Sequence, residues 1–224
     1  KTRWGSFDEL RQNTDKDALA ILKEATKNPK YKSNTDQGKA IIMYKAAMDT
    51  VARNKQGIAP LAPYLAKINA VKNTADLQKL LMETEAAGDG AGFFGFGIGA
   101  DEKDSNRNVV SLGPGSLGLP DRDYYVSDAP DNVEKREKYQ AHVARMLQFI
   151  GEDEKAAASS AAKILALETK MSTATLDRVE RRDRRKTYNP MTIAELQKLS
   201  PTVNWAKYYE GIGIGKLDSV VVSQ

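Results

Sequence analysis

The sequence has no cysteine and a single histidine, His142. Without cysteine the chain can form neither disulfides nor thiolate metal sites, and both a reducing cytosol and a bacterial periplasm stay open as its location. A hydrolytic zinc site needs three protein ligands, commonly including two histidines one helical turn apart. A nucleophilic Ser also needs a positioned base. These absences argue against hydrolase activity by these residues alone, and they favour His142 as an ordinary packed or surface side chain.

Long apolar runs are also missing. No stretch approaches the ~20 apolar residues that span a bilayer, and the chain does not open with a secretory signal pattern. It begins with Lys1 rather than Met, so we expect a processed or trimmed start. Hydrophobic residues make up 41% and charged residues 29% of the sequence, close to the globular average, which excludes extensive disorder.

The net charge of +4 is confined to one short segment. Residues 178–186 contain six cations and two acids, so the rest of the chain is neutral. A broad nucleic-acid footprint is therefore not indicated. We expect a solvated or internally paired loop. The alternative is a free-standing helical binding module that uses the basic loop 178–186 to hold an acidic partner.

Apolar residues at three- and four-residue steps predict a mainly helical chain. Capping boxes are predicted where Ser or Thr, or Asp, precedes Glu by three residues: Ser6 with Glu9, Asp131 with Glu134, and Thr192 with Glu195. Pro60 is expected in the first turn of one helix and Thr74 at the cap of the next. The expected helices are 6–25 (interrupted near 13–15), 36–53, 60–68, 74–81, 131–150, 152–175, 193–199 and 204–211.

The β content is expected to be small. Residues 93–100 alternate large apolar residues with glycine, and residues 109–112 follow a polar turn, so together they predict one antiparallel hairpin. Residues 217–222 also read as a strand, whose partner we expect outside this sequence. The predicted fold class is therefore mainly α, with a multi-helix lobe and a small antiparallel β hairpin. Both ends are expected to be cut from something larger.

Three sequence blocks are too specific for a generic helical chain. The longest is the nine-residue signature Leu-Gly-Leu-Pro-Asp-Arg-Asp-Tyr-Tyr at 117–125; the others are Arg-Trp-Gly-Ser-Phe-Asp at 3–8, with Leu10 and Arg11, and Arg-Arg-Asp at 181–183, with Tyr-Asn-Pro-Met-Thr at 188–192. Their order and spacing resemble the N-terminal part of the neprilysin-type zinc metallopeptidases. That family includes neprilysin, endothelin-converting enzyme and bacterial oligopeptidases.

The resemblance implies that residues 1–224 are the N-terminal domain, mostly the helical lobe, of a larger two-lobed peptidase. That lobe would confine small peptide substrates, and the C-terminal zinc catalytic domain, with its His-Glu-x-x-His helix, lies outside this sequence. Zinc would thus belong to the parent enzyme and none to this segment, which is expected to be inactive alone. The partners implied are peptides and the catalytic domain, with no nucleic acid and no membrane span. The location implied is periplasmic or extracytoplasmic, and a bacterial relative is favoured.

The resemblance also suggests site residues. In the family, paired arginines of the first block hold the C-terminal carboxylate of a bound peptide, and Arg3 and Arg11 match their positions. A guanidinium fork fits the two oxygens of a carboxylate. From the residues alone, the favoured interpretation is that Arg3 is a solvated end residue and Arg11 an ordinary helix-surface charge.

Two further features have competing interpretations. The signature 117–125 fits a scaffold role, with Tyr hydroxyls bonded and Arg122 paired with a carboxylate, better than direct substrate contact. The acidic turn of Asp101, Glu102 and Asp104 could attract a cation, but a solvated hairpin loop is the simpler interpretation.

Overall fold

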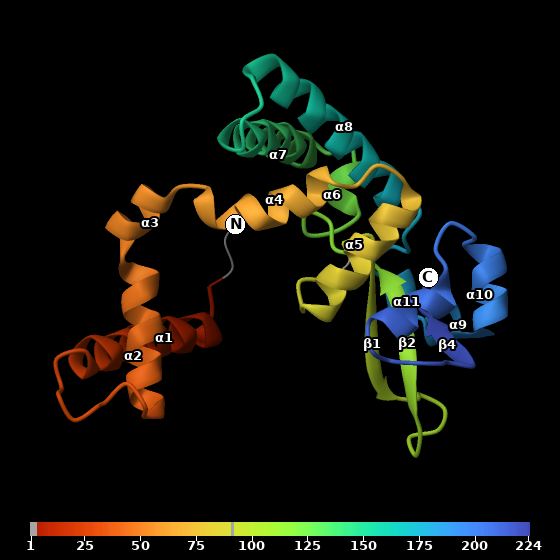
Figure 1. Cartoon of the computed structure of the whole chain (residues 1–224). Coiled ribbons are helices and arrows are strands. Elements are labelled where there is room, and N and C mark those ends of the chain that lie inside the picture. The colour runs from red at the N-terminus through yellow and green to blue at the C-terminus, as the bar shows by residue number, and fades with distance from the viewer. Residues whose placement is uncertain (1–3, 91) are drawn as a thin grey trace. The chain divides into compact units, whose positions relative to one another are not determined.

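The computed structural model describes residues 4–90 and 92–224. The chain divides into two compact units, residues 1–60 and 61–224, and each is described by itself. Figure 1 shows the helices and strands of both units, with labels where there is room.

The first unit contains three helices, α1 (Ser6–Ala25), α2 (Asp36–Met48) and α3 (Thr50–Gln56). The Ser6 capping box is wrong by one residue, because the Asp8 carboxylate accepts the backbone N–H of Gly5, 2.9 Å away. The expected break near residues 13–15 is also wrong. Thr14 turns its hydroxyl back onto the Leu10 carbonyl and stays within α1.

The helix expected over 36–53 is two helices. Asp49 leaves the helical conformation, with ψ at 75°, and its carboxylate accepts the N–H of Ala52 at 2.9 Å, which starts α3. The spacing of apolar residues predicted one continuous helix, but an Asp that caps a new helix can divide such a segment in two. Gly57, with φ at +52°, ends α3.

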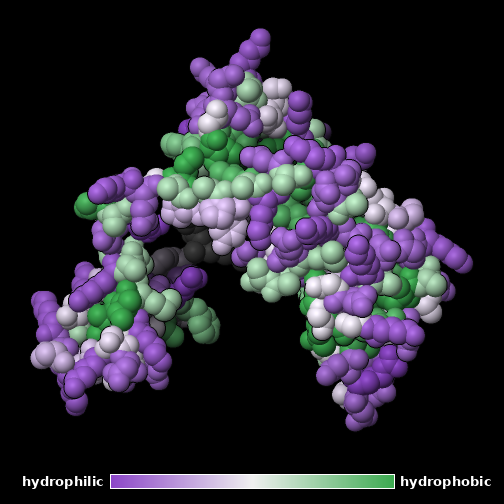
Figure 2. Space-filling model, viewed as in Figure 1, coloured by the Kyte–Doolittle hydropathy of each residue, from purple (hydrophilic) through white to green (hydrophobic). Residues whose placement is uncertain are grey.

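This first unit buries few side chains. Among the residues of α2, Gly38 and Ile41 are buried, and α1 buries none. Figure 2 shows hydrophobic residues reaching the surface of this unit among hydrophilic ones. The large exposed apolar residues here include Trp4, Phe7, Leu10, Ile21, Ile42, Met43, Met48 and Val51.

The second unit opens with α4 (Ala62–Asn69) and α5 (Thr74–Ala86), and a 3₁₀ turn (Ala59–Leu61) spans the boundary between the two units in the sequence. Two predicted boundaries move. Pro63, rather than Pro60, occupies the first turn of α4. Asn73, rather than Thr74, caps α5, since its side chain accepts the N–H of Asp76 at 2.9 Å.

Two antiparallel helices form a hairpin over residues 130–173. It consists of α7 (Pro130–Phe149) and α8 (Glu154–Thr173), and the short α6 (Asp123–Val126) packs on both. The Asp131–Glu134 box is wrong, because Pro130 lies in the first turn and Glu134 binds Lys138 instead. Asp153 caps α8 through Ala156 N–H at 2.8 Å.

The rest of the second unit alternates short elements: a 3₁₀ turn (Glu180–Arg182), α9 (Arg184–Thr187), β3 (Asn189–Thr192), α10 (Ile193–Leu199), α11 (Trp205–Gly211) and β4 (Ser219–Val222). The Thr192–Glu195 capping box is confirmed. Each side chain accepts the other's backbone N–H, at 3.2 and 2.8 Å.

The sheet has four strands in the order β1-β2-β4-β3. The predicted hairpin is confirmed as β1 (Phe94–Ala100) and β2 (Asn108–Pro114) in antiparallel pairing. The expectation that the last strand pairs outside this sequence is wrong. β4 lies parallel to β2 and antiparallel to β3.

The core of this unit lies between the sheet and α5, α10 and α11. Trp205, Tyr208 and Tyr209 are at most 3% exposed, and the Phe94 ring centroid lies 5.1 Å from those of both Trp205 and Tyr208. Such tilted and edge contacts are the favoured aromatic geometries. Val220 of β4 is equally buried. The mainly α fold class with a small β element is therefore confirmed.

Candidate functional site

The signature 117–125 is held by one carboxylate, that of Glu168 on α8. Glu168 accepts the hydroxyl of Tyr125 at 2.9 Å, the hydroxyl of Tyr139 at 3.1 Å and the backbone N–H of Gly118 at 3.2 Å. The Tyr125 hydroxyl in turn accepts the N–H of Leu119 at 2.8 Å. Tyr125 is 3% exposed. A buried tyrosine ring with a hydrogen-bonded hydroxyl is what the scaffold interpretation of the signature predicts.

The two tyrosines remain donors at neutral pH. Burial raises the pKa of Tyr125, and burial together with the Glu168 hydrogen bond raises the pKa of Tyr139 from its ordinary value of 10 to about 12. A raised folded pKa favours the protonated folded state. This contribution to stability is complete below pH 10 and is lost as the pH rises through the folded pKa.

An ion pair ties the signature to the basic loop. Asp121 pairs with Arg178 and also accepts the N–H of Asp123 at 3.0 Å. Arg122, the residue expected to pair with a carboxylate, makes no ion pair with the residues that the structure describes, and its buried Nε has no hydrogen-bond partner there. The prediction that Arg122 pairs with a carboxylate is therefore wrong, and the ion pair of the signature is that of Asp121 with Arg178.

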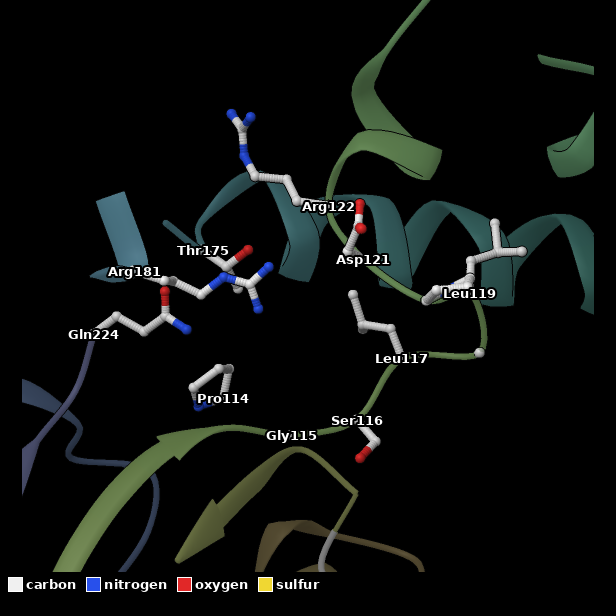
Figure 3. Close-up of a pocket in the computed structure, with 12 residues that line it drawn as sticks. Pro114, Gly115, Ser116, Leu117, Leu119, Asp121, Arg122, Thr175, Arg181 and Gln224 are labelled. Atoms are coloured by element: carbon white, nitrogen blue, oxygen red, sulfur yellow. The ribbon is translucent and has the colours of Figure 1, made fainter. Parts of the chain in front are cut away.

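A hollow of about 310 Å³ lies beside this ion pair. Its lining comes from the end of β2, the signature, the segment after α8, the 3₁₀ turn at Glu180–Arg182 and residue 224. The residues are Pro114, Gly115, Ser116, Leu117, Gly118, Leu119, Pro120, Asp121, Arg122, Thr175, Arg181 and Gln224. Figure 3 shows the Arg181 guanidinium reaching into the space, beside the Gln224 amide, whereas the Arg122 guanidinium points away. The hollow is thus reached by the guanidinium of Arg181 and has an apolar wall that includes Pro114 and Leu117.

A second hollow, of about 420 Å³, adjoins the first. The two share Pro114, Arg181 and Gln224, and the second is further lined by Glu102 and Arg184. Arg181 therefore lies at the boundary between two neighbouring spaces on the sheet side of the second unit.

Most of the basic loop is internally paired, as predicted. Arg184 binds Glu102 at 2.6 Å, Arg185 binds Asp183 at 2.9 Å and Lys186 binds Glu180 at 2.6 Å. The hydrogen bonds from Arg185 lower the pKa of Asp183. Together with the Arg178 pair, these contacts neutralise much of the local charge.

We therefore expect little binding of acidic macromolecules. Reversing the charge at Arg181, Arg182, Arg184 and Arg185 should leave the retention of the full-length protein on heparin or DNA nearly unchanged, since four of the loop's cations are paired with acids. Retention measured across a salt gradient checks this. Tight, salt-dependent binding that disappears in the charge-reversed protein would instead support the binding-module alternative.

The acidic turn, which follows β1, is connected through Asp101 to Tyr188, in the segment after the basic loop. Asp101 is 6% exposed and accepts the Tyr188 hydroxyl at 2.7 Å and the Lys103 N–H at 3.0 Å, and it pairs with Arg107 at 3.3 Å. These bonds lower its pKa, the Lys103 N–H first. Within the described residues no group of three or more His, Cys, Asp or Glu side chains could hold a metal ion.

Of the two predicted site residues, the structure describes one. Arg11 is exposed on α1 in the first unit, and Arg3 lies outside the described residues. His142 is exposed on α7. Among the described helices none is long and apolar enough to cross a membrane.

The chain thus combines many helices with a small mixed sheet and a signature held by Glu168, and its sequence resembles the N-terminal domains of a class of peptidases. The family model described as Peptidase family M13 matches residues 1–224. The chain belongs to this family.

The individual relatives agree. The chain is 30% identical over 217 residues to endothelin-converting enzyme 1 of Cavia porcellus and 26% identical over 219 residues to Neprilysin-3 of Drosophila melanogaster, and each match covers 94% of this chain and 28% of the relative. The solved structure of the Mycobacterium tuberculosis zinc metalloprotease Zmp1 with an inhibitor matches with a TM-score of 0.85 at 29% identity. That match covers 99% of this chain and 34% of Zmp1. The chain therefore spans about a third or less of the length of these relatives.

Proposed function

We propose that this chain is the substrate-confining part of a zinc metalloendopeptidase that hydrolyses small peptides. The observation that carries the proposal is the family match over all 224 residues, together with the likeness to Zmp1, a zinc metalloprotease. The described residues do not fit zinc, because they include one exposed His and no cluster of metal-binding side chains. Zinc and the catalytic base would thus come from residues outside this sequence, and the segment alone would be inactive.

The proposal gives the first unit a role in holding substrate. Arg3 and Arg11 would bind the C-terminal carboxylate of a peptide. The Arg11 side chain is exposed on α1 and has no ion pair within the described residues, so its fork is available. The catalytic domain would be the permanent partner, and the protein would act outside the cytoplasm, in the periplasm of a bacterium.

The test is hydrolysis of short peptides by the full-length protein. We expect cleavage that a zinc chelator abolishes and added zinc restores. Arg11→Ala should raise KM about tenfold for peptides with a free C-terminus, the value of one charge-assisted hydrogen bond, and leave amidated peptides unaffected. Lys16→Ala, which removes an exposed cation from the same helix, is the matched control.

Two results would count against the proposal. Chelator-insensitive or absent hydrolysis would remove the metalloendopeptidase assignment. An equal rise in KM for free and amidated peptides would show that Arg11 does not hold the terminal carboxylate.

A further inference from the structure

Two cations of the basic loop, Arg181 and Arg182, have no side-chain partner within the described residues, and Arg181 lines the hollow. Arg178, Arg184 and Arg185 are paired with acids, whereas Arg181 makes neither an ion pair nor a side-chain hydrogen bond there. Its guanidinium reaches into the space under the signature loop (Figure 3). A guanidinium with free N–H donors inside a concave surface is suited to an anion.

The residues around Arg181 indicate which kind of anion the hollow would bind. The Gln224 side chain accepts the Leu176 N–H at 2.6 Å through its oxygen, so its NH₂ group is the part left to donate. The carboxylate of Asp121 in the same lining is already held by Arg178 and does not need Arg181. Arg122 also lines the hollow, but its guanidinium points away (Figure 3). The donors that reach the space are therefore the Arg181 fork and the Gln224 amide.

Pro114 and Leu117 give the same space an apolar wall, and Figure 3 shows Leu117 projecting toward it. Leu119 also lines the space, but its side chain points away. A planar carboxylate matches a single guanidinium through two parallel hydrogen bonds, whereas a phosphate dianion would leave charge and acceptor oxygens unmatched by one cation. Methylene groups next to the carboxylate would contact the apolar wall.

We propose that this hollow binds a carboxylate on a short aliphatic stem, namely the side chain of a glutamate in a bound peptide, with Arg181 as its ligand. The inference adds to the proposed function a preference for acidic peptides, and it rests on that function for the choice of a peptide as the ligand. The residues of this hollow belong to the second unit, whereas Arg11 belongs to the first.

The experiment compares two peptides of identical length, both acetylated and amidated, that differ only in one Glu or Gln. Binding to the full-length protein, with zinc removed so that the peptides stay intact, is measured by calorimetry. The unmodified protein is expected to prefer the Glu peptide about tenfold, the value of one charge-assisted hydrogen-bonded pair. Arg181→Gln should abolish the preference, and Arg181→Lys should retain only part of it because it loses the fork.

Arg182→Gln is the matched control. Arg182 is the next residue, is exposed and does not line the hollow, so its loss should leave the preference intact. Where Arg181→Gln fails to fold, the Nε–Hε signal of Arg181 in ¹⁵N-arginine-labelled protein provides a second measurement, and it should shift with the Glu peptide only.

The remaining outcomes are decisive. Equal binding of both peptides, or loss of preference in Arg182→Gln as well, overturns the proposal. A preference that appears only when a Gln peptide carries a free C-terminus would place a terminal carboxylate in the hollow and overturn the glutamyl assignment. Arg181-dependent binding without any zinc-dependent hydrolysis would refute the peptidase function while leaving the carboxylate site standing.

Discussion

Replacing Glu168 with alanine is expected to lower the free energy of unfolding of the second unit by about 3 kcal/mol. The substitution leaves three donors without their acceptor: the hydroxyls of Tyr125 and Tyr139 and the N–H of Gly118. An unsatisfied buried donor costs about 1–3 kcal/mol, and partial access of water to this site reduces the sum. Denaturant unfolding of the full-length protein measures the change.

A second measurement locates the effect. Amide hydrogen exchange at Gly118 and Leu119 should accelerate more than exchange in the sheet, because the anchor of the signature loop is lost first. Lys163→Ala, an exposed substitution on the same helix, should change stability by less than about 0.5 kcal/mol. If Glu168→Ala were as mild as Lys163→Ala, the carboxylate would not be what holds the loop.

Gly115→Ala is expected to destabilise the second unit by about 3 kcal/mol or more. An added Cβ would overlap the carbonyl group of Gly92, and it would lie 2.6 Å from the carbonyl carbon of Phe93. These are backbone atoms at the start of β1, and Gly115 donates its N–H to Phe93 at 3.2 Å. Overpacking against backbone forces the hairpin end to shift, since no side chain can move aside.

The matched control is Gly99→Ala at the other end of β1. A Cβ there meets no atom within 4 Å, so stability should stay within about 0.5 kcal/mol of the original protein. Thermal unfolding of the two variants side by side makes the comparison. Equal melting temperatures would show that the chain at Gly115 can relax without cost.

The sequence predicted those structural features that depend on contacts between residues close together in the chain. The Thr192–Glu195 cap and the β1–β2 hairpin depend on residues close in sequence, and both were predictable. The other caps failed by one or a few residues because several acceptors compete at each helix start. Asp8 rather than Ser6, and Asn73 rather than Thr74, won that competition.

Contacts between distant residues were not predictable. The strand at 219–222 could be expected from its Val-rich run, but nothing local indicates that it pairs with β2 and β3. Glu168 carries no motif, since it is one glutamate in a helix of many polar residues. Arg181 lies in a recognised block, yet only the three-dimensional arrangement separates it from its paired neighbours.

The parallel pairing of β2 with β4 has a consequence for biosynthesis. β2 ends at Pro114 and β4 begins at Ser219, so about 105 residues must leave the ribosome before this edge of the hairpin is covered. At roughly 5–20 residues per second, the edge stays open for about 5–20 s. An open edge is a template for intermolecular pairing. The nascent chain would therefore need a chaperone most during this interval, and pausing the ribosome between these two strands should increase its aggregation.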